Sequence, residues 1–118
     1  EGANHVTTTN DPTAHAEVVA IRAACQKLGV FHLEGCEIYS SCEPCPMCLA
    51  AIYWAHIEKV YYACTHSDAA AAGFDDSLIY REMRKSVQER RVPMEQHQRD
   101  DAMRAFEAWR ASEMRREY

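Results

Sequence analysis

The spacing of apolar residues along the chain predicts helices that alternate with short strands. Apolar residues recur at helical spacing between Asp11 and Gly29, which predicts a helix capped by Thr13 and stopped by Gly29. A second helix is expected from about Pro46 to Ala55, because proline fits a first helical turn. A last amphipathic helix is expected around four apolar residues: Ala102, Ala105, Phe106 and Trp109.

Runs of β-prone residues predict the strands. Residues 59–64 form the clearest strand and residues 36–40 a shorter one, while residues 1–10 lack helical periodicity and predict the end of a strand followed by a loop. Strands that alternate with helices indicate an α/β layer with its ligands at the strand ends. Other short segments are expected later in the chain: helices at 67–72 and 78–85, a loop at 74–76 and a weak strand at 94–98.

The length and composition of the chain indicate a globular protein with one domain. Its 118 residues suffice for a single core over residues 1–118 and are too few for two ordinary domains. No apolar run is long enough to cross a bilayer, and no basic stretch followed by an apolar segment marks the start for export. We therefore expect a cytoplasmic protein that has no membrane partner.

The charge is unevenly distributed along the chain. Residues 1–80 carry three basic and ten acidic side chains, whereas residues 81–118 carry ten basic and eight acidic ones. A protein that holds long nucleic acid usually neutralises phosphates with clustered Lys and Arg. This distribution therefore disfavours a nucleic-acid substrate and suits a small, uncharged ligand.

Six cysteines without an export signal are typical of metal ligands or reduced core residues rather than disulfides. Cys42, Cys45 and Cys48 follow one another at three-residue intervals. The three isolated cysteines are interpreted as small buried hydrophobic residues: Cys25, Cys36 and Cys64.

One imidazole, two thiols and one carboxylate occur in the pattern His15-x-Glu17 followed by Pro44-Cys45-x-x-Cys48. Cys45 and Cys48 lie one helical turn apart, so both sulfurs can face one point. With His15 they give zinc three protein ligands and leave its fourth position open for water, as in catalytic sites. Both halves fall at predicted helix starts, where unpaired N–H groups favour ionisation of that water. Glu17 is too near His15 to bind the same metal comfortably and is predicted to be the general acid/base.

Two other metal sites are compatible with parts of this pattern. The cysteine triplet is similar to the run that holds an iron–sulfur cluster, but Ile52 stands where the fourth cysteine should fall. Cys42 could instead replace Cys45 or join it as a fourth ligand, which would close the site into a structural one.

The H-x-E and P-C-x-x-C elements resemble the signature of zinc-dependent nucleobase deaminases. Nearly the whole chain resembles the bacterial guanine deaminases of the cytidine deaminase fold. The related tRNA adenosine deaminases share the zinc motifs but usually carry Val in place of Pro46 and lack the Gly-Phe-Asp-Asp stretch. The resemblance rests on Asn-Asp-Pro-Thr-Ala-His-Ala-Glu at 10–17, Ser-Cys-Glu-Pro-Cys-Pro-Met-Cys at 41–48, Ala-Ile-Tyr-Trp-Ala at 51–55, Ala-Gly-Phe-Asp-Asp at 72–76 and Glu-Tyr at 117–118.

The resemblance implies a Zn2+ cofactor and a three-layer α/β/α cytidine deaminase-like fold. The chain is N-terminally incomplete in that fold, because the usual first helix and first two strands are absent. The remaining strands would leave one open edge and one bare face, which proteins normally cover. Either the sequence is part of a longer chain or another chain supplies the missing elements, and we favour the first.

The resemblance also implies roles for residues outside the zinc motifs. Asn4 would hydrogen-bond the purine, Trp54 would form part of the base pocket, and Asp76 would assist substrate binding or proton movement. Each has a structural alternative: Asn4 as a turn residue, Trp54 as core between helix and sheet, and Asp76 as a cap of the following helix.

In the resembled family the C-terminal tail reaches over the active site of a partner subunit. Residues 99–118 would then be exchanged within a homodimer. Phe106 and Trp109 would lie at the interface or in the lid, with packing inside their own chain as the alternative. A terminal aromatic residue has little local reason to be ordered. The resemblance therefore implies that Tyr118 covers the substrate.

The function indicated is hydrolytic deamination of a purine base, and the resemblance narrows it to guanine, with xanthine and ammonia as products. Hydroxide formed at the metal would attack C2 of the ring, and Glu17 would return protons to the ring nitrogen and to the leaving amine. A tRNA adenosine or other nucleoside deaminase is an alternative within the enzyme class. A non-catalytic, zinc-stabilised binding module is an alternative of another class, against which the unliganded Glu17 carboxylate counts.

Overall fold

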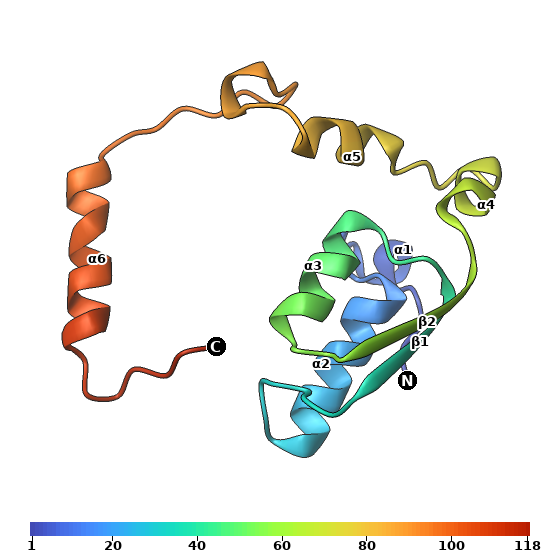
Figure 1. Ribbon diagram of the computed structural model, residues 1–118, viewed down its shortest axis with the longest axis horizontal. Helices are drawn as coiled ribbons and strands as arrows, with labels where there is room; N and C mark the ends of the chain where they lie inside the picture. The colour runs from blue at the N-terminus through green and yellow to red at the C-terminus, as the bar shows by residue number, and fades with distance from the viewer. The chain divides into compact units, whose positions relative to one another are not determined.

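The computed structural model describes residues 1–118, which divide into two compact units, Glu1–Tyr80 and Arg81–Tyr118. The elements are drawn in Figure 1. None of the helices combines the length and the apolar composition that a bilayer crossing requires. In chain order the elements are α1 (Val6–Thr9), α2 (Ala16–Leu28), β1 (Glu37–Cys42), α3 (Pro46–Trp54), β2 (Lys59–Cys64), α4 (His66–Ala71), α5 (Ser77–Met83), the 3-10 helix η1 (Val87–Glu89) and α6 (Arg99–Ala111).

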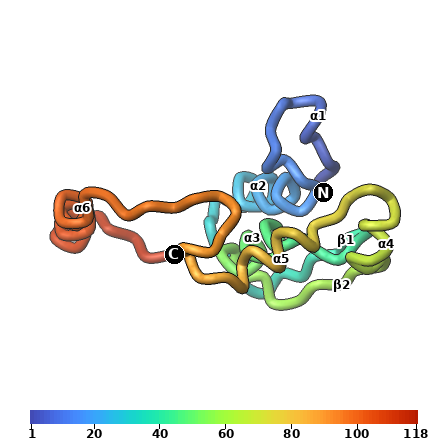
Figure 2. The backbone as a smooth tube through the Cα atoms, turned by 90° about the horizontal axis from the view of Figure 1, so that it is seen from above, coloured from blue at the N-terminus to red at the C-terminus, as the bar shows by residue number.

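The first unit is built on a parallel strand pair. Glu37 lies opposite Lys59 at one end of β1 and β2, and Cys42 lies opposite Cys64 at the other. A parallel pair needs a crossover connection, and α3 is part of it. α2 and α3 contact each other, beside the strands in Figure 1 and, seen from above, in Figure 2. The predicted α/β class is confirmed.

Local sequence explains where α2 and α3 begin and end. His15 and Cys45 are their N-cap residues, with extended backbones at ψ 153° and 167°, and Pro46 opens α3. Gly29 ends α2 at φ 68°, a left-handed conformation that glycine adopts without steric cost. The predicted end of α2 and the predicted start of α3 are confirmed.

The core of the first unit is small and apolar, and Cys48 is its one fully buried side chain. One face of the sheet, in contrast, exposes aromatic side chains. The rings of Tyr39 and Tyr61 stack there with centroids 4.6 Å apart, and Tyr39 is 73% exposed. This face is uncovered in the chain described here. The buried apolar residues are Ala14, Val18, Leu33, Cys48, Ile52 and Ala55.

The strand end predicted within residues 1–10 is wrong, because residues 6–9 form the single-turn helix α1. Asn4 Oδ1 accepts the backbone N–H of Val6 at 3.0 Å. The hydroxyls of Thr8 and Thr9 both donate to the carbonyl of His5. These short polar side chains give the backbone local partners in place of a neighbouring strand.

Three further expectations are wrong. Cys64, predicted to be buried, is exposed. Thr13 does not cap α2, because its hydroxyl donates to Asp11 Oδ1 at 2.6 Å and the helix begins later, behind His15. The weak strand at 94–98 is absent, and these residues have no regular structure. The sheet consists of β1 and β2 only, so an extended segment here has no strand with which to pair its backbone groups.

Candidate functional site

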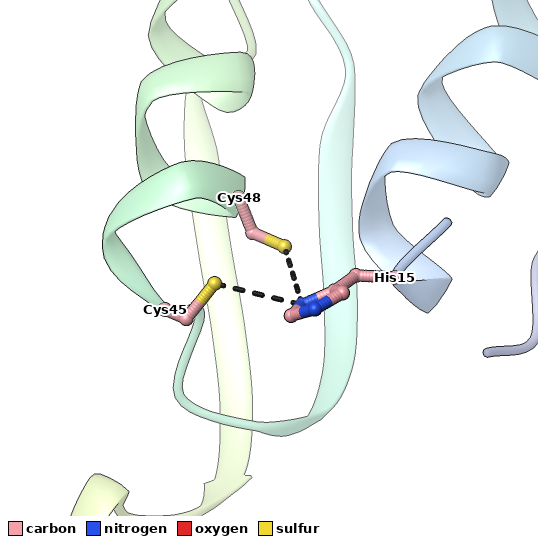
Figure 3. A group of neighbouring side chains, drawn as sticks. All are labelled: His15, Cys45 and Cys48. Atoms are coloured by element: carbon pink, nitrogen blue, oxygen red, sulfur yellow. Dashed lines mark hydrogen bonds between the residues drawn. The ribbon is translucent and has the colours of Figure 1, made fainter. Parts of the chain in front are cut away.

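The three predicted metal ligands come from the beginnings of two helices. His15 is the N-cap residue of α2, Cys45 is that of α3, and Cys48 lies in the first turn of α3. The His15 side chain makes no capping hydrogen bond to the backbone of α2. The imidazole and the two thiols instead point toward one another from segments 30 residues apart, as Figure 3 shows.

The distances in this group fit a tetrahedral zinc ion. His15 Nδ1 lies 3.6 Å from the sulfur of Cys45 and 3.6 Å from that of Cys48, and the three ligand atoms all lie within 4.8 Å of one another. Zn–N bonds of about 2.1 Å and Zn–S bonds of about 2.3 Å at tetrahedral angles place N and S about 3.6 Å apart. The residues present therefore match zinc in both donor type and spacing.

The two thiols hold their protons unequally. A hydrogen bond from the Cys48 thiol, helped by the backbone N–H groups of Cys48 and Met47, lowers the pKa of Cys45 to about 5. The same hydrogen bond, burial and the neighbouring Glu17 carboxylate raise the pKa of Cys48. At neutral pH the metal-free pair thus carries one negative charge, on Cys45, and one proton, on Cys48.

Glu17 lies beside this group and outside it. It occupies the first turn of α2, two residues after His15. Its carboxylate interacts with Cys48 by charge and by a side-chain hydrogen bond. The residues that converge as possible metal ligands are His15, Cys45 and Cys48, without Glu17. The structure therefore places a carboxylate next to the metal position that is not needed to hold the metal.

Cys42 is also outside the convergent group. Its thiol donates to the carbonyl of Thr65 at 3.6 Å. Burial, and then the charge of Cys64 on the paired strand, raise the pKa of Cys42, whereas a metal-binding cysteine needs its thiolate stabilised. This geometry gives no support to Cys42 as a replacement for Cys45 or as a fourth ligand.

Sequence reasoning missed a polar pair next to the zinc motif. Glu43 Oε2 accepts the backbone N–H and the Nδ1–H of His66, each at 3.1 Å. These two bonds lower the pKa of the Glu43 carboxyl. The ring of His66 in turn lies 6.3 Å from that of Tyr80. Glu43 could have been singled out as the one carboxylate inside the cysteine motif, but nothing in the sequence places His66 beside it.

The N-terminal segment brings Asn4 alongside α2. A Cβ atom on Gly2 would lie 2.5 Å from the Ala16 carbonyl oxygen and 2.6 Å from the Ala20 nitrogen, so the segment runs directly against the helix. The backbone N–H of His5 donates to Ala14 at 2.9 Å. Asn4 uses its carbonyl oxygen in the bond to Val6, so its alternative role as a turn residue is present in the structure.

Trp54 and Asp76 lie at the end of α3 and the beginning of α5. Trp54 is 63% exposed, which excludes the alternative of a core residue between helix and sheet. The Asp76 carbonyl accepts the backbone N–H of Ile79 at 2.9 Å in the first turn of α5. Burial, followed by the charges of Asp76, Glu43 and Cys45, raises the pKa of Tyr80. The charges of Asp76 and Cys45 therefore both act on the Tyr80 hydroxyl.

Tyr118 belongs to the second unit. Helix α6 buries none of its residues, and Phe106 and Trp109 are 59% and 42% exposed. The amphipathic helix predicted around these residues is confirmed over Arg99–Ala111. The role of Tyr118 at a substrate and the exchange of the tail stay predictions.

Comparison with known sequences matches residues 1–64 to a family model for the cytidine and deoxycytidylate deaminase zinc-binding region. The chain is 56% identical over all 118 residues to a guanine deaminase of Bacillus subtilis and spans 76% of that protein. It is 50% identical over 60 residues to a tRNA-specific adenosine deaminase of Aquifex aeolicus, with 51% of this chain and 40% of that protein covered.

Comparison with solved structures agrees with the sequences. The X-ray structure of the Bacillus subtilis guanine deaminase superimposes with a TM-score of 0.95 at 56% identity, over 99% of this chain and 74% of that one. The predicted cytidine deaminase-like fold and the zinc-binding character of the domain are confirmed. The similarity to the guanine deaminase covers both units of the chain, whereas the similarity to the tRNA-specific enzyme covers about half of it.

Proposed function

The chain belongs to the cytidine and deoxycytidylate deaminase family, among its guanine deaminases, and we therefore propose that it hydrolyses guanine to xanthine and ammonia with zinc. The observation that carries the proposal is the approach of His15 Nδ1 to within 3.6 Å of both Cys45 and Cys48, with the Glu17 carboxylate beside them. A purely structural zinc site has no use for such a carboxylate, so the arrangement supports catalysis over a binding module.

We assign zinc to His15, Cys45 and Cys48, which leave one of its four positions open. Zinc, when bound, supplies a Lewis acid that lowers the pKa of water. Glu17 accepts a proton from the attacking water and delivers it to a ring nitrogen of the base. Once the C–O bond to C2 has formed, Glu17 carries the hydroxyl proton to the amine, which leaves as ammonia.

We assign base recognition to Asn4, Trp54 and Asp76. The exposed indole of Trp54 offers a flat surface to a planar purine. Guanine presents N–H donors on its amino group and ring, which suit the carboxylate of Asp76, and carbonyl and ring-nitrogen acceptors, which suit the amide N–H groups of Asn4. Replacement of Asp76 by Asn should therefore lower turnover of guanine, and undiminished turnover would remove this role.

We also assign the protein to the cytoplasm and to a homodimer in which residues 99–118 of each subunit cover the other's site through Tyr118. The apolar side chains of α6 support an intersubunit role, because the helix buries none of them within its unit. The six cysteines are all free, which suits a reducing compartment.

A competition assay tests the substrate class. The chain shares zinc motifs with a tRNA-specific adenosine deaminase, so an RNA stem–loop that contains adenosine is the second candidate substrate. Zinc-loaded protein should convert guanine, and an excess of the stem–loop should neither be deaminated nor slow the reaction. Conversion of the RNA adenosine with guanine left intact would overturn the proposal.

A further inference from the structure

Hydrogen bonds tie the cysteine turn, residues 42–45, to the turn that follows β2. The Glu43 backbone N–H donates to the carbonyl of Cys64 at 2.8 Å. The Cys42 thiol donates to the carbonyl of Thr65 at 3.6 Å. Glu43 Oε2 then accepts both the backbone N–H and the ring Nδ1–H of His66 at 3.1 Å. His66 therefore binds the cysteine turn through two donors, its backbone N–H and its ring N–H.

The same residue continues the connection toward α5. The rings of His66 and Tyr80 are 6.3 Å apart and inclined at 53°, a normal separation for packed aromatic rings. The Tyr80 backbone N–H bonds to the Asp76 carbonyl at 3.4 Å. A continuous row of contacts thus joins the segment that carries Cys45 to the residue at the beginning of α5.

The exposure of the Glu43–His66 pair indicates that its effect is on position rather than on overall stability. The side chains are 31% and 54% exposed, and ion pairs so open to water contribute little to the free energy of unfolding. The placement of catalytic groups is more sensitive, because a displacement of about 1 Å can slow a reaction by about 100-fold.

We propose that His66 is a positioning residue, which holds the cysteine turn through Glu43 and the beginning of α5 through Tyr80 and so sets Cys45 relative to Asp76. The inference rests on the proposed function, in which Cys45 binds zinc and Asp76 contacts the base. His66 itself contacts neither zinc nor base in this assignment.

Two substitutions in the zinc-loaded chain test the bond to Glu43, and both remove the ring that faces Tyr80. His66→Asn keeps an N–H donor close to the position of Nδ1, so the bond to Glu43 can form. His66→Gln carries its amide further out and loses that bond. His97→Gln is the matched control, because His97 pairs with Glu95 at the same 3.1 Å in the second unit. Circular dichroism establishes that each variant is folded.

The first readout is the metal itself. His66→Gln should release zinc to a chelator about tenfold faster than the wild type, and the thiolate-to-cobalt absorption of the cobalt-substituted protein should shift. His66→Asn should restore both properties, and His97→Gln should change neither. A His66→Gln variant with wild-type zinc release and cobalt spectrum overturns the proposal, as does a His66→Asn variant that loses zinc equally fast.

A substitution of the acceptor, Glu43, tests the same bond if His66→Gln does not fold. Glu43→Ala removes the acceptor and should reproduce the faster loss of zinc, whereas wild-type release from this variant contradicts the link. Guanine turnover by the wild type is measured in parallel. A wild type that holds zinc but deaminates nothing overturns the proposed function, while the zinc-release data still decide the positioning role.

Discussion

At the scale of single residues, the unequal protonation of Cys45 and Cys48 makes zinc binding a proton-releasing reaction. The pKa of Cys45 is lowered to about 5 and that of Cys48 is raised, so at a pH between the two values the pair holds one thiol proton. This proton must leave when both sulfurs bind the metal. The affinity for zinc should therefore increase with pH, by about tenfold for each unit above neutral.

Competition with a chromophoric chelator at two pH values above neutral measures this slope. These pH values lie above the range in which histidine ordinarily titrates. The pH dependence of the zinc affinity therefore reports mainly the loss of the thiol proton. Cys64→Ser should leave the slope unchanged, because Cys64 is exposed and lies outside the metal group. A zinc affinity that is constant over the range contradicts the assignment of the proton to Cys48.

Spacing along the chain was sufficient to relate His15 to Glu17 and Cys45 to Cys48, because each pair lies at the beginning of one helix. The meeting of the two pairs, 30 residues apart, was predicted from the resemblance to the deaminase motifs. His66 could not be found in this way. It meets Glu43 only because β1 and β2 pair in parallel with Cys42 opposite Cys64, and that register has no local signal in the sequence.

At the scale of elements, helix boundaries with a local cause were predicted and those with a longer-range cause were not. Gly29 and Pro46 act within their own turns, so the end of α2 and the start of α3 could be placed from sequence. The strand expected at 94–98 depended on a partner that this sheet does not provide. The segment at 1–10 was misassigned because it lacks helical periodicity, yet here the hydroxyls of Thr8 and Thr9 close a single helical turn.

The close approach of the N-terminal segment to α2 gives a second prediction. Gly2→Ala would place a methyl group 2.5 Å from the Ala16 carbonyl oxygen and must push the segment away from the helix. Because Asn4 moves with it, KM for guanine should rise about fivefold, the equivalent of one weakened hydrogen bond. Steady-state kinetics measure the change, with Glu1→Ala as the control. An unchanged KM in Gly2→Ala would remove Asn4 from base recognition.

At the scale of the whole molecule, the proposed tail exchange requires that Tyr118 act on the other subunit's site. Removal of Tyr118 should slow guanine turnover about fivefold, as expected for the loss of one aromatic contact, and leave folding intact. An unchanged rate would exclude the covering role.

Co-expression with Glu17→Gln identifies which site the tail covers. In mixed dimers the intact tail of the Glu17→Gln subunit would cover the intact Glu17 site of the truncated subunit. Turnover per intact site should then exceed that of the truncated protein alone. The absence of any gain in isolated mixed dimers contradicts tail exchange.

The most direct test of the account is guanine turnover by zinc-loaded protein beside the Glu17→Gln variant, with bound zinc quantified in both. The wild type should form xanthine and ammonia in equal amounts, and Glu17→Gln should hold the same amount of zinc and form neither. Zinc-loaded wild type that releases no ammonia from guanine or from any other base, nucleoside or deoxynucleotide contradicts the central claim.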